Sequence, residues 1–366
     1  MLILFFIFLL LALVAMVVVI RKRIRPWPKK LVLLLTTIIL QVVFFGLFLF
    51  PPFGQISAGV QDQVQTTRFF LKRPCTVPAE QTEPDLREFP VLAWMPKLLP
   101  STPLPVVLYS PGSFGGENAN TILCETLAAK GYIVLAMSHP YHTVSTALSD
   151  GRNIRVDLEF LKSVMTNPHD LPRSKQLSHF RTWVGMPVDD MTFLLNSIQE
   201  GNLPEVVQKH IDTNQIFLSG HSLGGAAALE IGRKRPSELK GIIALESPYF
   251  CDILDVKDNQ FRYVQEDYPL PVLNIYSDSL WTRLPSMAGT EYDTNVKMLN
   301  APSAKWISVH IDGAGHLGLS DLRNVSPIGT KLLDGFLDTA PYEEVVEKIN
   351  AAALAFLTPL TDPVQQ

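Results

Sequence analysis

The chain has 366 residues; 47% of them are hydrophobic, and 31 Lys and Arg stand against 35 Asp and Glu. This apolar content excludes an intrinsically disordered chain. The first 61 positions hold six basic residues, all between Arg21 and Lys30, which leaves 25 basic against 35 acidic residues beyond position 61. Such an acidic remainder is not expected to bind nucleic acid, because attraction to phosphate needs clustered Lys and Arg.

Two apolar stretches open the chain, Met1–Ile20 and Leu31–Phe50. Twenty residues at about 1.5 Å each form a helix about 30 Å long, which matches the hydrocarbon core of a bilayer. We therefore predict two membrane-spanning helices that form a hairpin over residues 1–50. A signal peptide or a single anchor is the alternative. A signal peptide is disfavoured, because no basic residue precedes the first run and no small-residue cleavage site follows it.

The loop between the predicted spans, residues 21–30, holds the six basic residues and Trp27. Positive charge in a short loop stays on the cytoplasmic side, and Trp favours the membrane interface. We therefore expect a cell-membrane protein with two spans, whose chain after Phe50 is extracytoplasmic. Prolines, glycines and glutamines then predict a linker over residues 51–68, and one large domain is expected over residues 69–366.

Short apolar runs alternate with helical patterns beyond the linker. Continuous apolar strands separated by helices are typical of a mostly parallel sheet that is covered on both faces, so an α/β fold is predicted. Strands are expected at Phe89–Trp94, Val106–Tyr109, Ile133–Met137, Ile216–Ser219, Ile242–Leu245, Val272–Tyr276 and Trp306–Ile311. Helices are expected at Asn118–Lys130, Asp189–Ile198, Gly225–Lys234 and Tyr342–Phe356.

The strongest motif is Gly220-His221-Ser222-Leu223-Gly224, which follows an apolar strand and precedes an Ala-rich helix. A G-x-S-x-G sequence between a strand and a helix is typical of a nucleophile elbow, which exposes the serine hydroxyl at the edge of the sheet. The alternative is a glycine-rich turn with an incidental serine. We predict Ser222 as a catalytic nucleophile.

A serine nucleophile needs a base, and His316 is the candidate. It lies in the glycine-rich loop Asp312–Gly318, directly after the last predicted strand. The order serine, acid, histidine along the chain is the order for this kind of site. His310 lies within that strand and is expected to be structural, whereas His139 and His142 belong either to the pocket or to an ordinary loop.

Two carboxylates are candidates for the acid that orients His316. Glu246 follows the strand Ile242–Leu245, and Asp278 follows the strand Val272–Tyr276. Both strand ends are expected near Ser222, so either side chain can hold the imidazole. Asp278 comes only two residues after its strand, a short reach, so Glu246 is preferred and Asp278 remains open.

An oxyanion hole is expected from two backbone amides. One is the N–H of Leu223, the residue after the nucleophile. The other is assigned to Ser113, in the glycine-rich loop 110–116 that follows the strand Val106–Tyr109. The alternative for this loop is a plain connection between a strand and a helix.

Neither a cofactor nor a metal is expected, because GxGxxG, P-loop, HExxH and EF-hand patterns do not occur. Cys75, Cys124 and Cys251 have no CxxC or metal-site spacing, and their odd number leaves at least one outside any intramolecular disulfide. Arg181, Asp189 and Asp190 are expected to form a structural ion-pair region.

These motifs resemble the α/β-hydrolase fold and, within it, the platelet-activating-factor acetylhydrolase (group VII phospholipase A2) branch. The resemblance covers about residues 89–333. It rests on four segments: Pro105–Gly112, Ala129–Val134, Gly220–Gly225 and the pair Gly315-His316.

The resemblance implies that the acid follows the strand after the nucleophile helix. Glu246 occupies that place, although an aspartate is more usual there. It also implies an oxyanion donor at Ser113. The chain departs from the family at Pro111, where a His-Gly pair is common, and in its membrane hairpin.

The expected protein is therefore a membrane-anchored serine hydrolase that cleaves carboxylic esters. Lipid or short-acyl phospholipid esters are the expected substrates, and the apolar stretches Leu161–Met165 and Pro248–Leu254 are candidates for a lid. The alternatives are an esterase for soluble or polymeric esters and a catalytically inactive binding or sensing module.

Overall fold

The computed structural model describes residues 14, 17, 21, 27–52, 54–166, 168–301 and 303–361. Its centre is an eight-stranded sheet with the strand order β1-β2-β4-β3-β7-β8-β11-β12. β1 and β2 pair antiparallel, as do β2 and β4, and all other neighbours are parallel. The strands are β1 (Val64–Pro74), β2 (Leu86–Pro96), β3 (Leu104–Ser110), β4 (Ile133–Met137), β7 (Ile211–His221), β8 (Gly241–Leu245), β11 (Val272–Ser277) and β12 (Trp306–Ile311).

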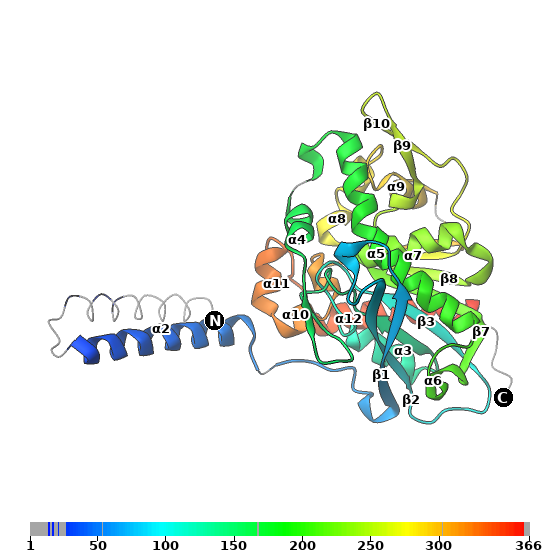
Figure 1. Cartoon of the computed structure of the whole chain (residues 1–366). Helices are drawn as coiled ribbons and strands as arrows, with labels where there is room; N and C mark the ends of the chain where they lie inside the picture. The colour runs from blue at the N-terminus through cyan, green and yellow to red at the C-terminus, as the bar shows by residue number, and fades with distance from the viewer. Residues whose placement is uncertain are drawn as a thin grey trace.

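Helices cover both faces of the sheet (Figure 1), so β3, β4 and β8 are buried along their whole length. Side chains alternate along a strand. Val106 and Leu108 therefore pack in the core beneath α5 (Arg173–Gln199) and α7 (Ser222–Lys234), whereas Val107 and Tyr109 pack in a second core beneath α3 (Thr121–Ala129) and α12 (Tyr342–Leu357). The seven predicted strands and the mostly parallel sheet are confirmed.

Several predicted boundaries were wrong. β1 begins at Val64, inside the linker predicted over residues 51–68. α5 begins at Arg173, sixteen residues before the predicted start at Asp189, and α7 begins at Ser222 itself. The prediction also lacked two hairpins and a set of short helices: β5 (Ser145–Ala147), β6 (Asn153–Arg155), β9 (Ile253–Lys257), β10 (Gln260–Tyr263), α4 (Leu158–Met165), α6 (Glu205–Gln208), α8 (Asp278–Trp281), α9 (Asp293–Asn300), α10 (Leu322–Val325) and α11 (Pro327–Leu333).

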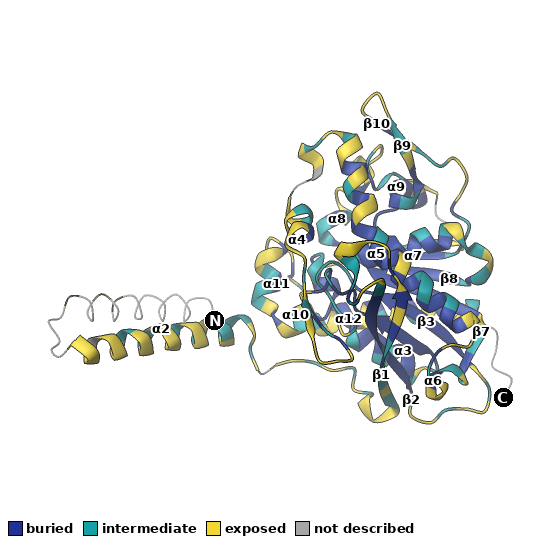
Figure 2. Ribbon diagram, in the orientation of Figure 1, coloured by how far each residue is buried: buried dark blue, intermediate teal, exposed yellow. Residues whose placement is uncertain are grey.

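The N-terminal helix α2 (Trp27–Leu49) extends away from the α/β domain (Figure 1), and most of its residues are exposed (Figure 2). By length and composition it is apolar enough to cross a membrane. Its start at Trp27 corrects the predicted loop, since residues 27–30 are helical. The predicted first span, Met1–Ile20, lies outside the described residues apart from positions 14 and 17; within the described residues the structure shows one apolar helix.

Candidate active site

The turn between β7 and α7 has the geometry of a nucleophile elbow. Ser222 has a φ of +52°, in the left-handed region that residues other than glycine rarely adopt. The flanking glycines are required by close packing: a Cβ on Gly220 would lie 2.5 Å from the backbone of Gly224, and a Cβ on Gly224 would lie 2.2 Å from the carbonyl oxygens of Ser110 and Pro111. The strained turn holds Ser222 at the carboxyl end of the sheet.

Three side chains that are far apart in the sequence form a hydrogen-bonded chain at this point. His316 Nε2 lies 3.1 Å from Ser222 Oγ, and His316 Nδ1 lies 2.7 Å from Glu246 Oε1. This is the arrangement in which an imidazole accepts a proton from a serine while a carboxylate fixes its tautomer.

Glu246 is buried at the end of β8, where it has a φ of +46°. Its Oε2 accepts hydrogen bonds from the backbone N–H and the hydroxyl of Ser277, which leaves Oε1 for His316. The carboxylate is therefore held on both oxygens, and the hydrogen bonds favour its charged form.

Asp278, the other candidate acid, makes different contacts. Its Oδ1 lies 2.7 Å from His310 Nε2, and its Oδ2 accepts from the N–H of Gly313 at 3.0 Å. The structure brings Glu246, and not Asp278, to the ring of His316. His310 lies in β12 and stacks on Trp281 at 4.9 Å between ring centroids, which agrees with the structural role expected for it.

The loop that carries His316 is held by side chains from beyond α11. Asp334 accepts hydrogen bonds from the N–H groups of Leu317 and Gly318, and Asp338 accepts from that of Gly315. The N–H of His316 itself donates to Ser279 Oγ at 2.9 Å. The segment after the histidine therefore fixes the position of the imidazole.

The electrostatic surroundings prepare the pair for proton transfer. Burial alone would lower the pKa of His316, but the hydrogen bond and the charge of Glu246 outweigh it and raise that pKa above its ordinary value. Burial would raise the pKa of Glu246, but His316 and Ser277 lower it. Burial and the neighbouring His316 lower the pKa of His221 to about 3, so His221 is neutral at physiological pH.

We expect kcat/KM to fall as the pH is lowered, because His316 acts as a base only when it is unprotonated. The apparent pKa of this fall should lie above 6.5, since the pKa of His316 is raised above that value. Replacing Glu246 by Gln removes the main cause of the rise, so the acid limb should move to lower pH while the rate falls. The measurement is a pH–rate profile of both proteins. Asp278→Asn is the control, and a limb that moves with Asp278 instead of Glu246 would contradict the assignment.

The two segments predicted to donate to an oxyanion lie together beside Ser222. Leu223 is the second residue of α7, so its N–H has no carbonyl acceptor within the helix. Gly112 packs so closely that a Cβ there would lie 3.2 Å from Ser222 Cβ, and the adjacent Ser113 lines the same cavity as Ser222. The geometry thus brings the loop 110–116 to the nucleophile.

A cavity of about 510 Å³ opens at Ser222 and His316. Much of its wall is apolar, from Phe114, Val144, Val164, Leu322, Val325 and Leu333. Of the two stretches expected to form a lid, Leu161–Met165 lies in α4 and contributes Val164 to this wall, whereas Pro248–Leu254 does not line the cavity.

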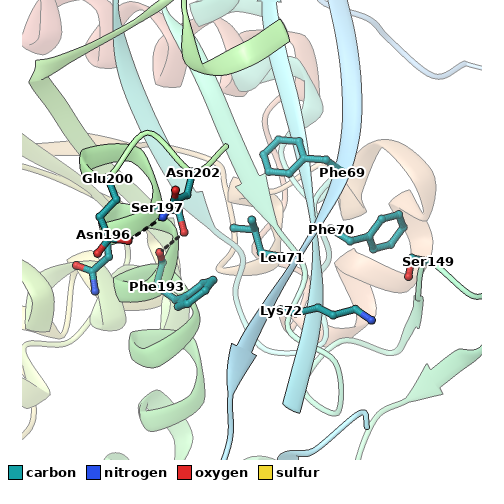
Figure 3. A pocket seen from close by; sticks show the side chains of 10 residues that line it. All are labelled: Phe69, Phe70, Leu71, Lys72, Ser149, Phe193, Asn196, Ser197, Glu200 and Asn202. Carbon is teal, nitrogen blue, oxygen red and sulfur yellow. Dashed lines mark hydrogen bonds between the residues drawn. The ribbon is translucent and has the colours of Figure 1, made fainter. Parts of the chain in front are cut away.

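A hollow of about 660 Å³ lies elsewhere, between β1 and the end of α5 (Figure 3). Phe69, Phe70 and Phe193 line it together with polar side chains such as Asn196 and Glu200. No histidine is among its lining residues, and the hydroxyls of its two serines, Ser149 and Ser197, donate to Glu88 and to the carbonyl of Phe193. The chemistry therefore points to the smaller cavity.

A buried polar chain behind the loop 110–116 was missed in the sequence. Ser110 Oγ lies 2.9 Å from His139 Nε2, and His139 Nδ1 lies 2.9 Å from Asp190 Oδ2. Arg87 and Arg73 donate to the same carboxylate at 2.9 and 2.7 Å. All five side chains are buried, so this second Ser–His–Asp chain is closed to substrate and instead anchors the start of the loop.

Asp190 does form ion pairs, as expected, but its partners are Arg87 and Arg73. Arg181, the expected partner, instead donates to the carbonyl of Leu254. Burial would raise the pKa of Asp190, but the charge of Arg87 and the hydrogen bonds from His139 and Arg87 lower it. The sequence held two signals: His139, two residues after a predicted strand, and Asp190 in the expected ion-pair region.

Removing this charge should destabilise the fold. We expect Asp190→Asn to reduce the free energy of unfolding by about 3–5 kcal/mol, because it leaves the buried guanidinium of Arg87 without its counter-ion and removes the nearest carboxylate from Arg73. Urea denaturation of the full chain measures the change. Asp189→Asn is the matched control: the Asp189 side chain is 63% exposed, and its loss should cost less than about 0.5 kcal/mol. Equal losses in the free energy of unfolding for the two variants would contradict the stabilising role assigned to Asp190.

One group of described residues has the composition of a metal site: Asp278, His310 and Asp312. Asp278 and His310 already satisfy each other by a hydrogen bond, and Asp312 is exposed. The structure therefore offers no observation that calls for an ion there. Cys75, Cys124 and Cys251 are all free thiols.

Comparisons with known proteins identify the fold. No family model matches the chain. A Schizosaccharomyces pombe protein with the name "Putative phospholipase A2" is 21% identical over 293 residues; the match covers 66% of this chain and 64% of that protein, so the chain matches less than two thirds of the relative's length.

Among solved structures, a ferulic acid esterase from Streptomyces cinnamoneus superposes with a TM-score of 0.60 at 19% identity and covers 82% of this chain and 94% of its own. A "Putative Dienelactone Hydrolase" from Klebsiella pneumoniae reaches a TM-score of 0.44 at 17% identity and covers 79% of this chain and 99% of its own. Sheet order, elbow and the structural likeness to the esterase agree: the chain has the α/β-hydrolase fold.

Proposed function

We propose that the protein is a serine hydrolase that cleaves carboxylic esters. Ser222 Oγ attacks the acyl carbon while His316 accepts its proton, and Glu246 orients the imidazole. The N–H groups of Leu223 and Ser113 stabilise the oxyanion. His316 then returns the proton to the leaving alcohol, and water, deprotonated by the same imidazole, releases the carboxylic acid and restores Ser222.

The observation that carries this proposal is a continuous chain of hydrogen bonds at the wall of a cavity. Ser222 Oγ lies 3.1 Å from His316 Nε2, and His316 Nδ1 lies 2.7 Å from Glu246 Oε1. The names of the relatives supply independent support, because a phospholipase A2 and a ferulic acid esterase both act on esters.

Lipid or short-acyl phospholipid esters, of the kind that a platelet-activating-factor acetylhydrolase cleaves, are the proposed substrates. The support is the apolar wall of the cavity and the adjacent α2, which would place the site near lipid. A ferulic acid esterase shares the fold, so esters of soluble alcohols are the second candidate.

We also propose that residues 1–50 form the membrane hairpin, with the loop 21–30 in the cytoplasm and the hydrolase domain outside it. The support is the exposed, apolar α2 and the basic residues before it. The test is a glycosylation acceptor inserted either before Trp27 or in the linker after Phe50. Modification of the linker acceptor alone supports the proposal. Modification of the acceptor before Trp27 alone would show the reverse orientation.

A fluorophosphonate probe tests the activity directly, since it forms a bond only with an activated serine. We expect the full chain to be labelled on Ser222, with hydrolysis of vesicle-borne and micellar phospholipid esters. Faster hydrolysis of monomeric soluble esters would favour the second candidate. A folded chain that is neither labelled nor active would be an inactive binding or sensing module.

A further inference from the structure

An exposed, mostly apolar surface lies beside the mouth of the active-site cavity. Arg323 and Asp334 in this segment are buried, and Lys331 is half-buried. The exposed residues from α10 to the end of the segment are all uncharged: Leu322, Val325, Pro327, Leu332, Leu333, Gly335, Phe336 and Leu337. Leu333 is 67% exposed and Phe336 54%. We call this surface the 322–337 face; an exposed apolar patch of this kind marks an interaction site.

The 322–337 face is continuous with the cavity. Leu322, Val325 and Leu333 belong to it and also line the cavity that contains Ser222. α4 also contributes Val164 to the wall and exposes Leu158 and Met165 at 74% and 68%. Both segments therefore line the cavity with apolar side chains and carry further apolar side chains that are exposed.

The same face is tied to the end of α2. Ser326, which precedes α11, donates from its hydroxyl to the carbonyl of Leu49, the last residue of α2, at 2.7 Å. Asn324 exchanges two hydrogen bonds with the backbone of Ile56, at 2.9 and 2.8 Å. Figure 1 shows α10 and α11 on the side of the domain from which α2 departs.

The length of α2 gives the level of the membrane surface. Its 23 residues form a helix about 34 Å long, which slightly exceeds a hydrocarbon core of about 30 Å. Leu49 then lies where the apolar helix leaves the bilayer. Because Ser326 is bonded to Leu49, the 322–337 face lies at that same level, where amphipathic surfaces insert apolar side chains among lipid headgroups.

We propose that the 322–337 face docks on the leaflet from which α2 emerges, so that the cavity opens toward the membrane and ester lipids enter Ser222's site from the bilayer. This inference rests on the proposed function, since it assumes that α2 spans the membrane and that Ser222 cleaves esters. The occupant of the face is the lipid surface, because the hydrogen bond between Ser326 and Leu49 keeps the face next to it.

Fluorescence quenching tests the docking. A cysteine replaces either Phe336 or Leu254, which is similarly exposed (52%) but lies on β9, away from α2 (Figure 1). Each full chain carries an environment-sensitive dye and is reconstituted into phosphatidylcholine vesicles that contain headgroup-labelled nitroxide lipid, with the unsubstituted chain as the labelling blank. We expect strong quenching at position 336 and little at 254. Equally weak quenching at the two positions would overturn the proposal. A change in fluorescence at position 336 that follows the number of protein molecules per vesicle, and not the nitroxide lipid, would also overturn it and would indicate a second copy on the face.

A kinetic measurement tests the entry route. The variant combines Leu332→Asp and Phe336→Asp, two side chains outside the cavity wall, and the control is Leu254→Asp. We expect hydrolysis of a fluorogenic phospholipid in the vesicle to fall about tenfold, because charge opposes insertion, while hydrolysis of a short water-soluble ester stays within about twofold. An unchanged ratio of the two rates would refute the entry of lipids from the membrane and would leave the proposed function standing. A wild-type chain without Ser222-dependent hydrolysis of either substrate refutes the proposed function.

Discussion

Replacing Ser222 by alanine is expected to reduce kcat/KM for ester hydrolysis by about 10⁴- to 10⁶-fold, because it removes the hydroxyl that forms the acyl intermediate in the proposed mechanism. What remains is the catalysis that the oxyanion donors and the cavity supply without a nucleophile. Steady-state hydrolysis and fluorophosphonate labelling measure the effect, and His316→Ala should cause a loss of similar size, since the two side chains act as a unit.

Ser219→Ala is a matched control for this experiment. Ser219 lies three residues earlier on β7, and its buried hydroxyl has no hydrogen-bond partner among the described residues. Its removal should therefore change kcat/KM by less than about twofold and leave the fold intact. Labelling that persists in Ser222→Ala would show that another serine is the nucleophile.

Replacing Glu246 by glutamine is expected to lower kcat by about 10³- to 10⁴-fold. The amide retains the size of the side chain but cannot supply the charge that fixes the tautomer of His316 and stabilises its protonated form. Asp278→Asn should change kcat by less than about tenfold, because Asp278 contacts His310 and Gly313 and reaches His316 only through the loop.

The two carboxylate variants are best compared with a thermal unfolding measurement on each. Glu246 also accepts from Ser277, so a variant that has lost the fold would imitate a loss of catalysis. A folded Glu246→Gln chain with near wild-type kcat, together with a large loss in Asp278→Asn, would reassign the acid.

The success of the strand predictions has a local cause. β3, β4 and β8 are covered on both faces, so every residue in them is apolar or small and the run stands out in the sequence. β1 is an edge strand that pairs with β2 alone, and none of its first five residues, Val64–Arg68, is buried. Its mixed pattern resembles a linker, which is why the predicted linker ran too far.

The predicted start of α5 was wrong for a different reason. Pro187 lies inside the helix, and a proline removes one hydrogen bond and normally ends or kinks a helix. The sequence therefore favours a helix that begins after it, at Asp189. In the fold, Phe180, Trp183 and Val184 of the preceding turns are buried in the core, and this burial outweighs the lost hydrogen bond.

The choice between Glu246 and Asp278 required the three-dimensional structure. Both follow neighbouring parallel strands, β8 and β11, whose carboxyl ends meet at the same edge of the sheet. The backbone of Glu246 adopts a positive φ that directs its carboxylate to His316. Asp278 instead begins the short helix α8 and faces β12. The short spacing between Asp278 and its strand favoured Glu246, but these two directions are visible only in the fold.

The sequence by itself determined the features that depend on neighbouring residues: the apolar strands, the elbow at Ser222, the glycine-rich loop at His316 and the apolar α2. Only the tertiary structure decided which distant groups meet. Asp190 and Arg87 are 103 positions apart, and Ser326 and Leu49 are 277 apart. Local patterns reflect backbone sterics and burial, whereas such pairings follow from the path of the whole chain, and this path brings the 322–337 face, α2 and the mouth of the cavity together.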